Sequence, residues 1–164
     1  MKLSLSVAVG NYDRTRALID GRVQIEGVSP VFMTLSPEEM FFRAFRHADF
    51  DVTELSLASH AVSLANGTNQ YLALPIFLSR AFRHSSIYVT RQSSIQKPKQ
   101  LMGKRIGIAE YQLTANVWAR ALLEDDFGII PSEICWVRGG MDEPARPEKL
   151  HLELTSDLTD ETAG

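Results

Sequence analysis

Arg80, Arg83 and His84 lie close together in the stretch LSRAFRHSSIYVT, residues 78–90. A guanidinium group can bind a carboxylate through two parallel hydrogen bonds, and an imidazole changes its charge near neutral pH. Cations placed so near one another repel unless an anion or nearby acids compensate them. The stretch therefore predicts a site for a small anion just before a strand, with a solvated cluster of surface charge as the alternative.

Further candidates follow the predicted strands. In parallel α/β sheets, ligands bind outside the carboxyl ends of the strands, where helix N-termini present unpaired N–H groups. By this rule the candidate side chains are Tyr12, Arg14, Glu54, Ser56, Tyr111, Thr114 and Arg138. Tyr12 and Tyr111 each come between a strand and a helix, so a flat aromatic ring could lie between them.

Each of these candidates has a plainer alternative. Tyr12 and Tyr111 could be turn residues that cover a sheet edge, and Arg14 could lie on a solvated helix face. Glu54 could be a buried acid that pairs with one of the cations. Cys135 lies between Ile134 and Trp136 and is predicted to be a core residue.

The elements that must position these residues alternate between strand and helix. Strands are predicted at residues 3–9, 31–35, 51–55, 71–77, 86–90, 105–109 and 134–137. Helices are predicted to begin at Asp13, Ser36, Ser56 and Thr114, with Asp13, Ser36 and Thr114 as their N-caps. The clearest start is Ser36-Pro37-Glu38-Glu39, which combines a cap, a first-turn proline and a capping-box glutamate. Regular alternation predicts an α/β fold with a mainly parallel sheet covered by helices.

The polar, proline-containing residues 92–102 predict a linker between two lobes. Residues 1–91 would form the first lobe, and residues 103–150 would begin a second α/β lobe that is incomplete. Residues 151–164 have too little apolar content to bury and predict a frayed acidic tail.

Composition excludes several classes of function. The net charge of −3, without long blocks of one sign, disfavours nucleic-acid binding. One cysteine and four scattered histidines predict no metal site, and the absence of Walker A, GxGxxG, GxSxG and HExxH motifs predicts no nucleotide cofactor and no serine hydrolase chemistry. The N-terminus lacks a sustained apolar region, which predicts a cytoplasmic protein with no membrane segment.

Several motifs together resemble the 4,5-dihydroxyphthalate decarboxylase family, whose fold is similar to that of the type 2 periplasmic binding proteins. The motifs are VGNYDRTRALIDGRV, LSPEEMFFRAF, FDVTELSLAS, PIFLSRAFRHSSIYV, GKRIGIAEYQLTANVWARALLEDDFG and WVRGG. The resemblance implies two lobes around a ligand cleft and the removal of one carboxylate from a dihydroxylated aromatic dicarboxylate. It also implies a chain about twice as long, so we expect a truncated second lobe with exposed edges that favour homo-oligomers.

Under this resemblance, Arg80 and Arg83 would hold carboxylate oxygens and His84 would relay a proton. Glu54 would orient His84 or receive a hydroxyl proton. The remaining candidates would shape the cleft around a small anionic aromatic carboxylate. Two other hypotheses stay open: a cytoplasmic solute-binding or sensory module on the same fold, and an incomplete product without activity.

Overall fold

The computed structural model describes residues 1–139 and 158–159 of the 164-residue chain. The chain divides into two compact units, Met1–Arg80 and Ala81–Gly164. We call them the first and the second unit and describe each by itself. No helix in the described part of the chain is long and apolar enough to cross a membrane.

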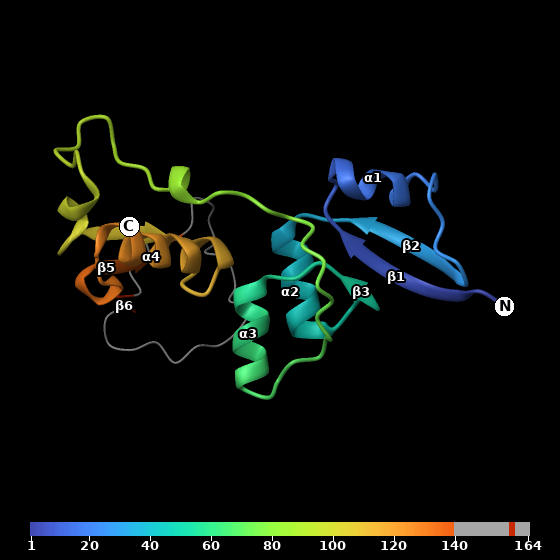
Figure 1. Cartoon of the computed structure of the whole chain (residues 1–164). Coiled ribbons are helices and arrows are strands. Elements are labelled where there is room, and N and C mark those ends of the chain that lie inside the picture. Colours follow the sequence, from blue (N-terminus) through green and yellow to red (C-terminus); the bar gives the residue numbers. More distant parts are fainter. Residues whose placement is uncertain (140–157, 160–164) are drawn as a thin grey trace. The chain divides into compact units, whose positions relative to one another are not determined.

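The first unit consists of three parallel strands and three helices (Figure 1). In chain order these are β1 (Leu3–Val9), α1 (Asp13–Ile19), β2 (Val28–Thr34), α2 (Pro37–His47), β3 (Val52–Thr53) and α3 (Leu57–Ala65). The strand order is β2-β1-β3, so β1 lies in the middle, where Val7 pairs with Phe32 on one side and with Val52 on the other. The predicted α/β class with parallel strands is confirmed.

The core of the first unit lies between β1 and α2. Ala8, Met40 and Ala44 are completely buried, and Phe50 packs with them. The connection from β1 through α1 to β2 and the connection from β2 through α2 back past β1 to β3 cross the sheet in opposite directions. Because such connections are right-handed, α1 and α2 cover opposite faces of the sheet, as Figure 1 shows.

The predicted start of α2 is confirmed. Ser36 is its N-cap and accepts a hydrogen bond from the Glu39 N–H, and Pro37 is the first helical residue. Strand β2 begins three residues earlier than predicted and includes Pro30. A proline fits there because β2 is an edge strand, in which an N–H can be missing without the loss of a ladder hydrogen bond.

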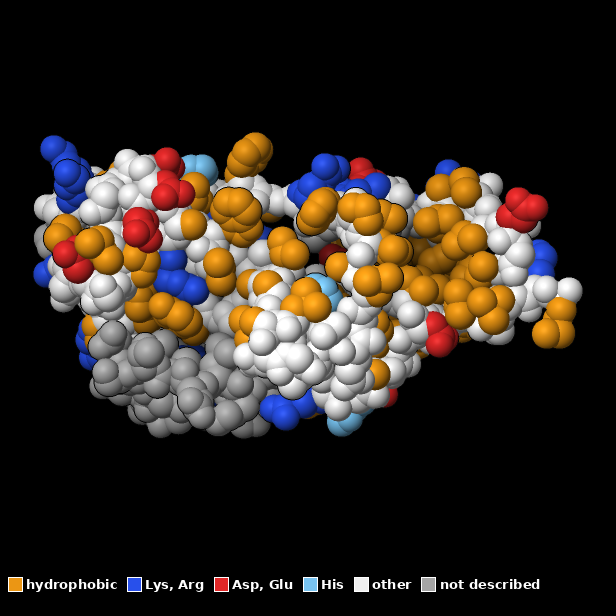
Figure 2. Space-filling model, turned by 60° about the horizontal axis from the view of Figure 1, so that its bottom comes forward, with side chains coloured by type: hydrophobic (Ala, Val, Ile, Leu, Met, Phe, Trp, Pro, Cys, Tyr) orange, Lys and Arg blue, Asp and Glu red, His pale blue; other side chains and the backbone are white. Residues whose placement is uncertain are grey.

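Much apolar surface of the first unit remains exposed. Figure 2 shows apolar side chains gathered at the end of the unit that carries β1 and β2. On these strands Leu3 and Val31 are 60% and 59% exposed. Surfaces of this kind commonly mark contacts with another part of a chain or with a partner.

In its described residues, 81–139 and 158–159, the second unit has a parallel sheet of short strands and one long helix. Its elements are η1 (His84–Ser86), η2 (Pro98–Leu101), β4 (Arg105–Ile108), α4 (Thr114–Phe127), η3 (Pro131–Glu133), β5 (Cys135–Arg138) and β6 (Leu158–Thr159), where η denotes a 3-10 turn. The strand order is β4-β5-β6. The core consists of Leu101, Leu123, Ile129, Ile134 and Trp136. Gly128 ends α4 in the left-handed conformation that favours glycine.

Two predicted strands are wrong. Residues 71–77 and 86–90 form no strand, although both stretches are rich in apolar residues. Pro75 cannot donate to a ladder, and the Ile76 N–H bonds back to the Leu74 carbonyl at 2.7 Å in a tight turn. Leu72 is 90% exposed. An apolar stretch forms a strand only where a neighbouring strand is present to pair with it.

The expected linker, residues 92–102, lies in the second unit, where Leu101 is buried in the core. Residues 140–150 of the expected second lobe lie outside the described residues. So does the expected frayed tail, residues 151–164, except for Leu158–Thr159, which pairs as β6 with β5.

Candidate functional site

The carboxyl ends of β1 and β3 bring Tyr12 and Glu54 together. Because these strands are parallel neighbours, the residues that follow them meet at one edge of the sheet. The Tyr12 hydroxyl lies 3.0 Å from Glu54 Oε1, and the Gly10 N–H donates to Glu54 Oε2 at 3.2 Å. Both carboxylate oxygens of Glu54 are therefore held by a donor from the turn after β1.

The Tyr12 ring lies directly against Gly10. A Cβ atom placed on Gly10 would lie 2.5 Å from Tyr12 Cζ and 2.6 Å from its hydroxyl oxygen. The buried Thr15 side chain fixes this turn, since its hydroxyl donates to the Gly10 carbonyl at 3.0 Å and accepts from the Tyr12 N–H at 3.1 Å. Tyr12, and not the predicted Asp13, is the residue that precedes α1 as its N-cap.

Burial raises the pKa of the Tyr12 phenol, a hydrogen bond with Ser79 opposes this shift, and the Glu54 carboxylate adds to it. Arg14 lies over the same ring, with its Cζ atom 4.8 Å from the ring centroid. Its guanidinium also donates to the Leu78 carbonyl and pairs with Asp13 at 3.0 Å. The phenol thus lies between a carboxylate and a guanidinium.

Ser56 and Arg80 complete the candidates in the first unit. Ser56 is 4% exposed and caps α3, where its hydroxyl accepts from the Ser59 N–H at 3.4 Å. It lies two residues beyond Glu54, at the N-terminus of α3. Arg80 is exposed at the end of the unit.

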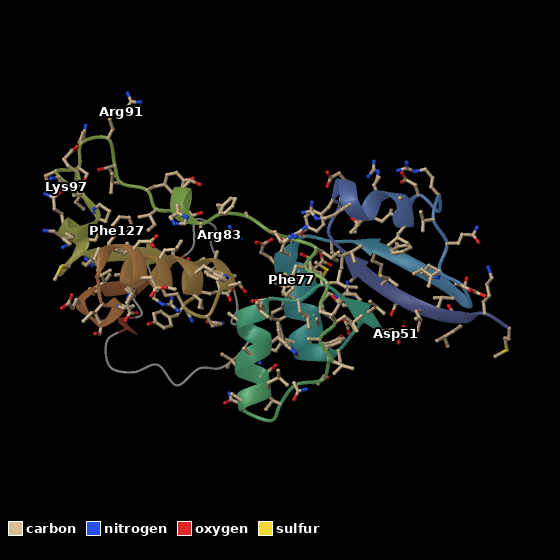
Figure 3. The ribbon with its side chains drawn as sticks, viewed as in Figure 1. Asp51, Phe77, Arg83, Arg91, Lys97 and Phe127 are labelled. Atoms are coloured by element: carbon tan, nitrogen blue, oxygen red, sulfur yellow. The ribbon has the colours of Figure 1, made fainter. Side chains whose placement is uncertain are left out.

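In the second unit, His84 pairs with Asp126 of α4. The distance from His84 Nε2 to Asp126 Oδ2 is 3.1 Å, and both side chains are about half exposed. Asp126 was not among the candidate residues nominated from the sequence, where Glu54 would orient His84 or receive a hydroxyl proton. Arg83, the residue before η1, is half-buried (Figure 3).

Tyr111 contacts both Arg120 and Trp136. The Arg120 Cζ atom is 3.7 Å from the Tyr111 ring centroid and 5.8 Å from that of Trp136. Its guanidinium donates to the Tyr111 carbonyl at 2.8 Å, and burial lowers the pKa of Arg120. Sequence reasoning missed Arg120, because its partner ring lies one turn before the helix and nothing in the local pattern distinguishes it from a solvated arginine.

Buried polar groups surround the start of α4. Glu110 and Gln112 are 3% and 7% exposed, and their side chains bond to each other at 3.3 Å. Thr114 is the first helical residue, and Leu113, not Thr114, occupies the cap position. Arg138 ends β5 opposite Ile108, so it lies at the edge of the sheet where the Glu110 turn begins.

No protein-family model matches the chain. Two curated relatives, both named 4,5-dihydroxyphthalate decarboxylase, match almost all of it. The relative from Comamonas testosteroni is 61% identical over 153 residues, which cover 93% of this chain and 46% of the relative. The relative from Pseudomonas putida is 57% identical over 162 residues, which cover 99% of this chain and 63% of the relative. The chain spans about half to two thirds of the length of these relatives, and over nearly all of its own length its sequence resembles the 4,5-dihydroxyphthalate decarboxylases.

Proposed function

We propose that the chain takes part in the decarboxylation of 4,5-dihydroxyphthalate or a closely similar dihydroxylated aromatic dicarboxylate. The observation that carries the proposal is the identity of 57% and 61%, over nearly the whole chain, to two proteins named for this reaction. At such identity the side chains at a shared site are mostly the same, although fold alone would not specify chemistry.

The Tyr12–Glu54 site supports this reaction. Loss of carbon dioxide from a hydroxylated ring needs a base for a ring hydroxyl, so that electron density reaches the carbon that bears the carboxylate, and a proton for that carbon. Glu54, held on both oxygens, is suited to accept the hydroxyl proton. The C–C bond to the carboxylate then breaks, its electron pair stays on the ring carbon, and that carbon takes up the proton.

The other candidates have roles that the reaction would use. Arg14, Arg80 and Arg83 are the cations proposed for the two carboxylates, and His84 is proposed to relay the proton. The contacts proposed for the ring and its oxygens come from Tyr12, Ser56, Tyr111, Thr114 and Arg138. The proposal needs no cofactor.

The proposal includes a fold of the type 2 periplasmic binding protein class, with residues 1–91 and 103–150 contributing to two lobes. Two features support it: each unit has parallel strands, and in each unit candidate residues follow the carboxyl ends of those strands. Cytoplasmic location and self-association remain predictions from the sequence.

The test is release of carbon dioxide from 4,5-dihydroxyphthalate by the 164-residue chain, with calorimetric titration of the same compound. We expect turnover, and we expect Glu54→Gln to reduce it by about 100-fold or more. The exposed Glu26 provides the matched control, since Glu26→Gln removes a carboxylate outside the site. Binding without turnover would make the chain a binding module. The absence of both binding and turnover would refute the proposal.

A further inference from the structure

We propose that Gly10 is a positioning residue for Glu54: its N–H binds one carboxylate oxygen, and its missing side chain leaves the space from which the Tyr12 hydroxyl binds the other. This inference rests on the proposed function in so far as Glu54 is the base. The arrangement itself is a property of the turn after β1.

Space, and not backbone conformation, is what requires a glycine here. Five described glycines have a positive φ, which side chains disfavour, and Gly10 is not among them. An alanine could therefore adopt the Gly10 backbone without strain. Its Cβ atom, however, would lie 2.5 to 2.6 Å from three atoms of the Tyr12 ring, far closer than atoms can approach without a shift.

The Tyr12 side chain is the group that would move. The backbone of Tyr12 is held in place, because the Tyr12 N–H and the Gly10 carbonyl are both hydrogen-bonded to the buried Thr15 hydroxyl. The ring can rotate away from an added methyl group, but its hydroxyl then leaves Glu54 Oε1, which it meets at 3.0 Å. The methyl group added by Gly10→Ala should therefore displace the Tyr12 ring and remove one of the two hydrogen bonds that orient Glu54.

The orientation matters because a base must present a free lone pair to the proton that it removes. With one donor on each oxygen, Glu54 cannot rotate about its carboxylate axis without breaking a hydrogen bond. A carboxylate held in this way needs no reorganisation when a ring hydroxyl arrives.

A double-mutant cycle on the full 164-residue chain tests the positioning role. Urea unfolding midpoints are measured for the wild type, Gly10→Ala, Tyr12→Ala and the double variant. We expect Gly10→Ala to lower the midpoint in the wild type and to leave it unchanged in the Tyr12→Ala background, where the ring is gone. In a Tyr12→Phe background the ring remains, so the effect should persist. Gly107→Ala is the matched control, because no described atom lies within 4 Å of its added Cβ.

Equal effects of Gly10→Ala with and without the Tyr12 ring would overturn the inference. If Gly10→Ala alone fails to fold while the double variant folds, the ring clash is demonstrated directly. If Tyr12→Ala does not fold, Tyr12→Leu takes its place in the cycle.

Two further readouts distinguish orientation from stability. In turnover, Gly10→Ala should lower kcat toward the Glu54→Gln value with a smaller change in KM, and Gly107→Ala should change neither. In ultraviolet titration, with Tyr12→Phe subtracted to isolate Tyr12, Gly10→Ala should shift the Tyr12 midpoint and Gly107→Ala should not. A wild type without turnover would refute the proposed function, and the cycle and the titration would then decide on Gly10. If Gly10→Ala left the titration midpoint of Tyr12 unchanged, the inference would be refuted, even if the wild-type chain showed turnover.

Discussion

The Tyr12 hydroxyl donates to the Glu54 carboxylate across 3.0 Å, although the two residues are 42 positions apart in the chain. The contact exists because β1 and β3 are parallel neighbours, which places the turn after one strand beside the first residue after the other. Because the half-buried Tyr12 phenol contacts this carboxylate, the ionisation of Tyr12 reports on the contact independently of any reaction.

The first prediction concerns the alkaline limb of stability. The folded pKa of Tyr12 is raised above its ordinary value of 10.0, so the neutral phenol is favoured in the folded state. This contribution is fully present below about pH 10 and is lost as the pH rises through the folded pKa. The difference in urea midpoint between the wild type and Tyr12→Phe should therefore be constant from about pH 8 to about pH 9 and should narrow as the pH rises above about 10.

Tyr88→Phe is the control, because Tyr88 is 86% exposed. Its difference from the wild type should not change with pH. Glu54→Gln removes the carboxylate that helps to raise the pKa of Tyr12. In that background, the change with pH of the midpoint difference caused by Tyr12→Phe should be smaller. A difference between the wild type and Tyr12→Phe that stays constant up to about pH 11 would contradict the assignment.

The elements of the first unit that the sequence predicts best are those whose signals are local. Ser36 and Pro37 specify the start of α2 by themselves, because a cap and a first-turn proline satisfy or remove N–H groups within one turn. Residues 71–77 form an equally clear apolar run and yet form no strand, because a strand depends on a partner elsewhere in the chain.

The same distinction between local signals and contacts of distant segments applies to the site. The rule for strand ends was enough to nominate Tyr12 and Glu54 for one edge of a sheet, and the structure brings them together. It could not identify Asp126 as the acid beside His84, since that contact links an irregular segment to the last turn of a helix. Nor could it find Gly10, whose importance depends on where the Tyr12 ring lies in space.

The second prediction concerns Asp51, which extends the short pairing between β1 and β3 (Figure 3). Asp51 Oδ2 accepts from the Ser6 N–H at 2.8 Å and from the Ser6 hydroxyl at 2.7 Å, and these hydrogen bonds lower the pKa of Asp51. A lowered pKa stabilises the fold above the ordinary value of 3.8, and the contribution is lost as the pH falls through the folded pKa. Asp51→Ala should therefore lower the urea midpoint at about pH 7 and have a smaller effect near pH 3.

Asp125→Ala serves as the comparison, because Asp125 is an exposed acid of α4 in the second unit. If Asp51→Ala lowered the urea midpoint equally at both pH values, the contact would not depend on the charge of Asp51.

The third prediction concerns Arg120, whose guanidinium lies 3.7 Å from the Tyr111 ring centroid and donates to the Tyr111 carbonyl. Replacement by alanine removes a cation–π contact and a hydrogen bond, which together contribute about 1–2 kcal/mol in a partly buried setting. Arg120→Lys keeps the positive charge but loses the planar group that stacks on the ring, so it should recover only part of this stability.

The measurement is urea unfolding followed by tryptophan fluorescence, since Trp136 is 5% exposed in the core of the second unit and lies edge-on to Tyr111 at 6.4 Å. The exposed Arg91 supplies the matched control, as Arg91→Ala removes an equal charge without a ring contact (Figure 3). We expect the urea midpoint to be highest for Arg91→Ala, lower for Arg120→Lys and lowest for Arg120→Ala. If lysine restored the full midpoint, positive charge alone would be sufficient at this position, and the planar stack would not be what stabilises the turn before α4.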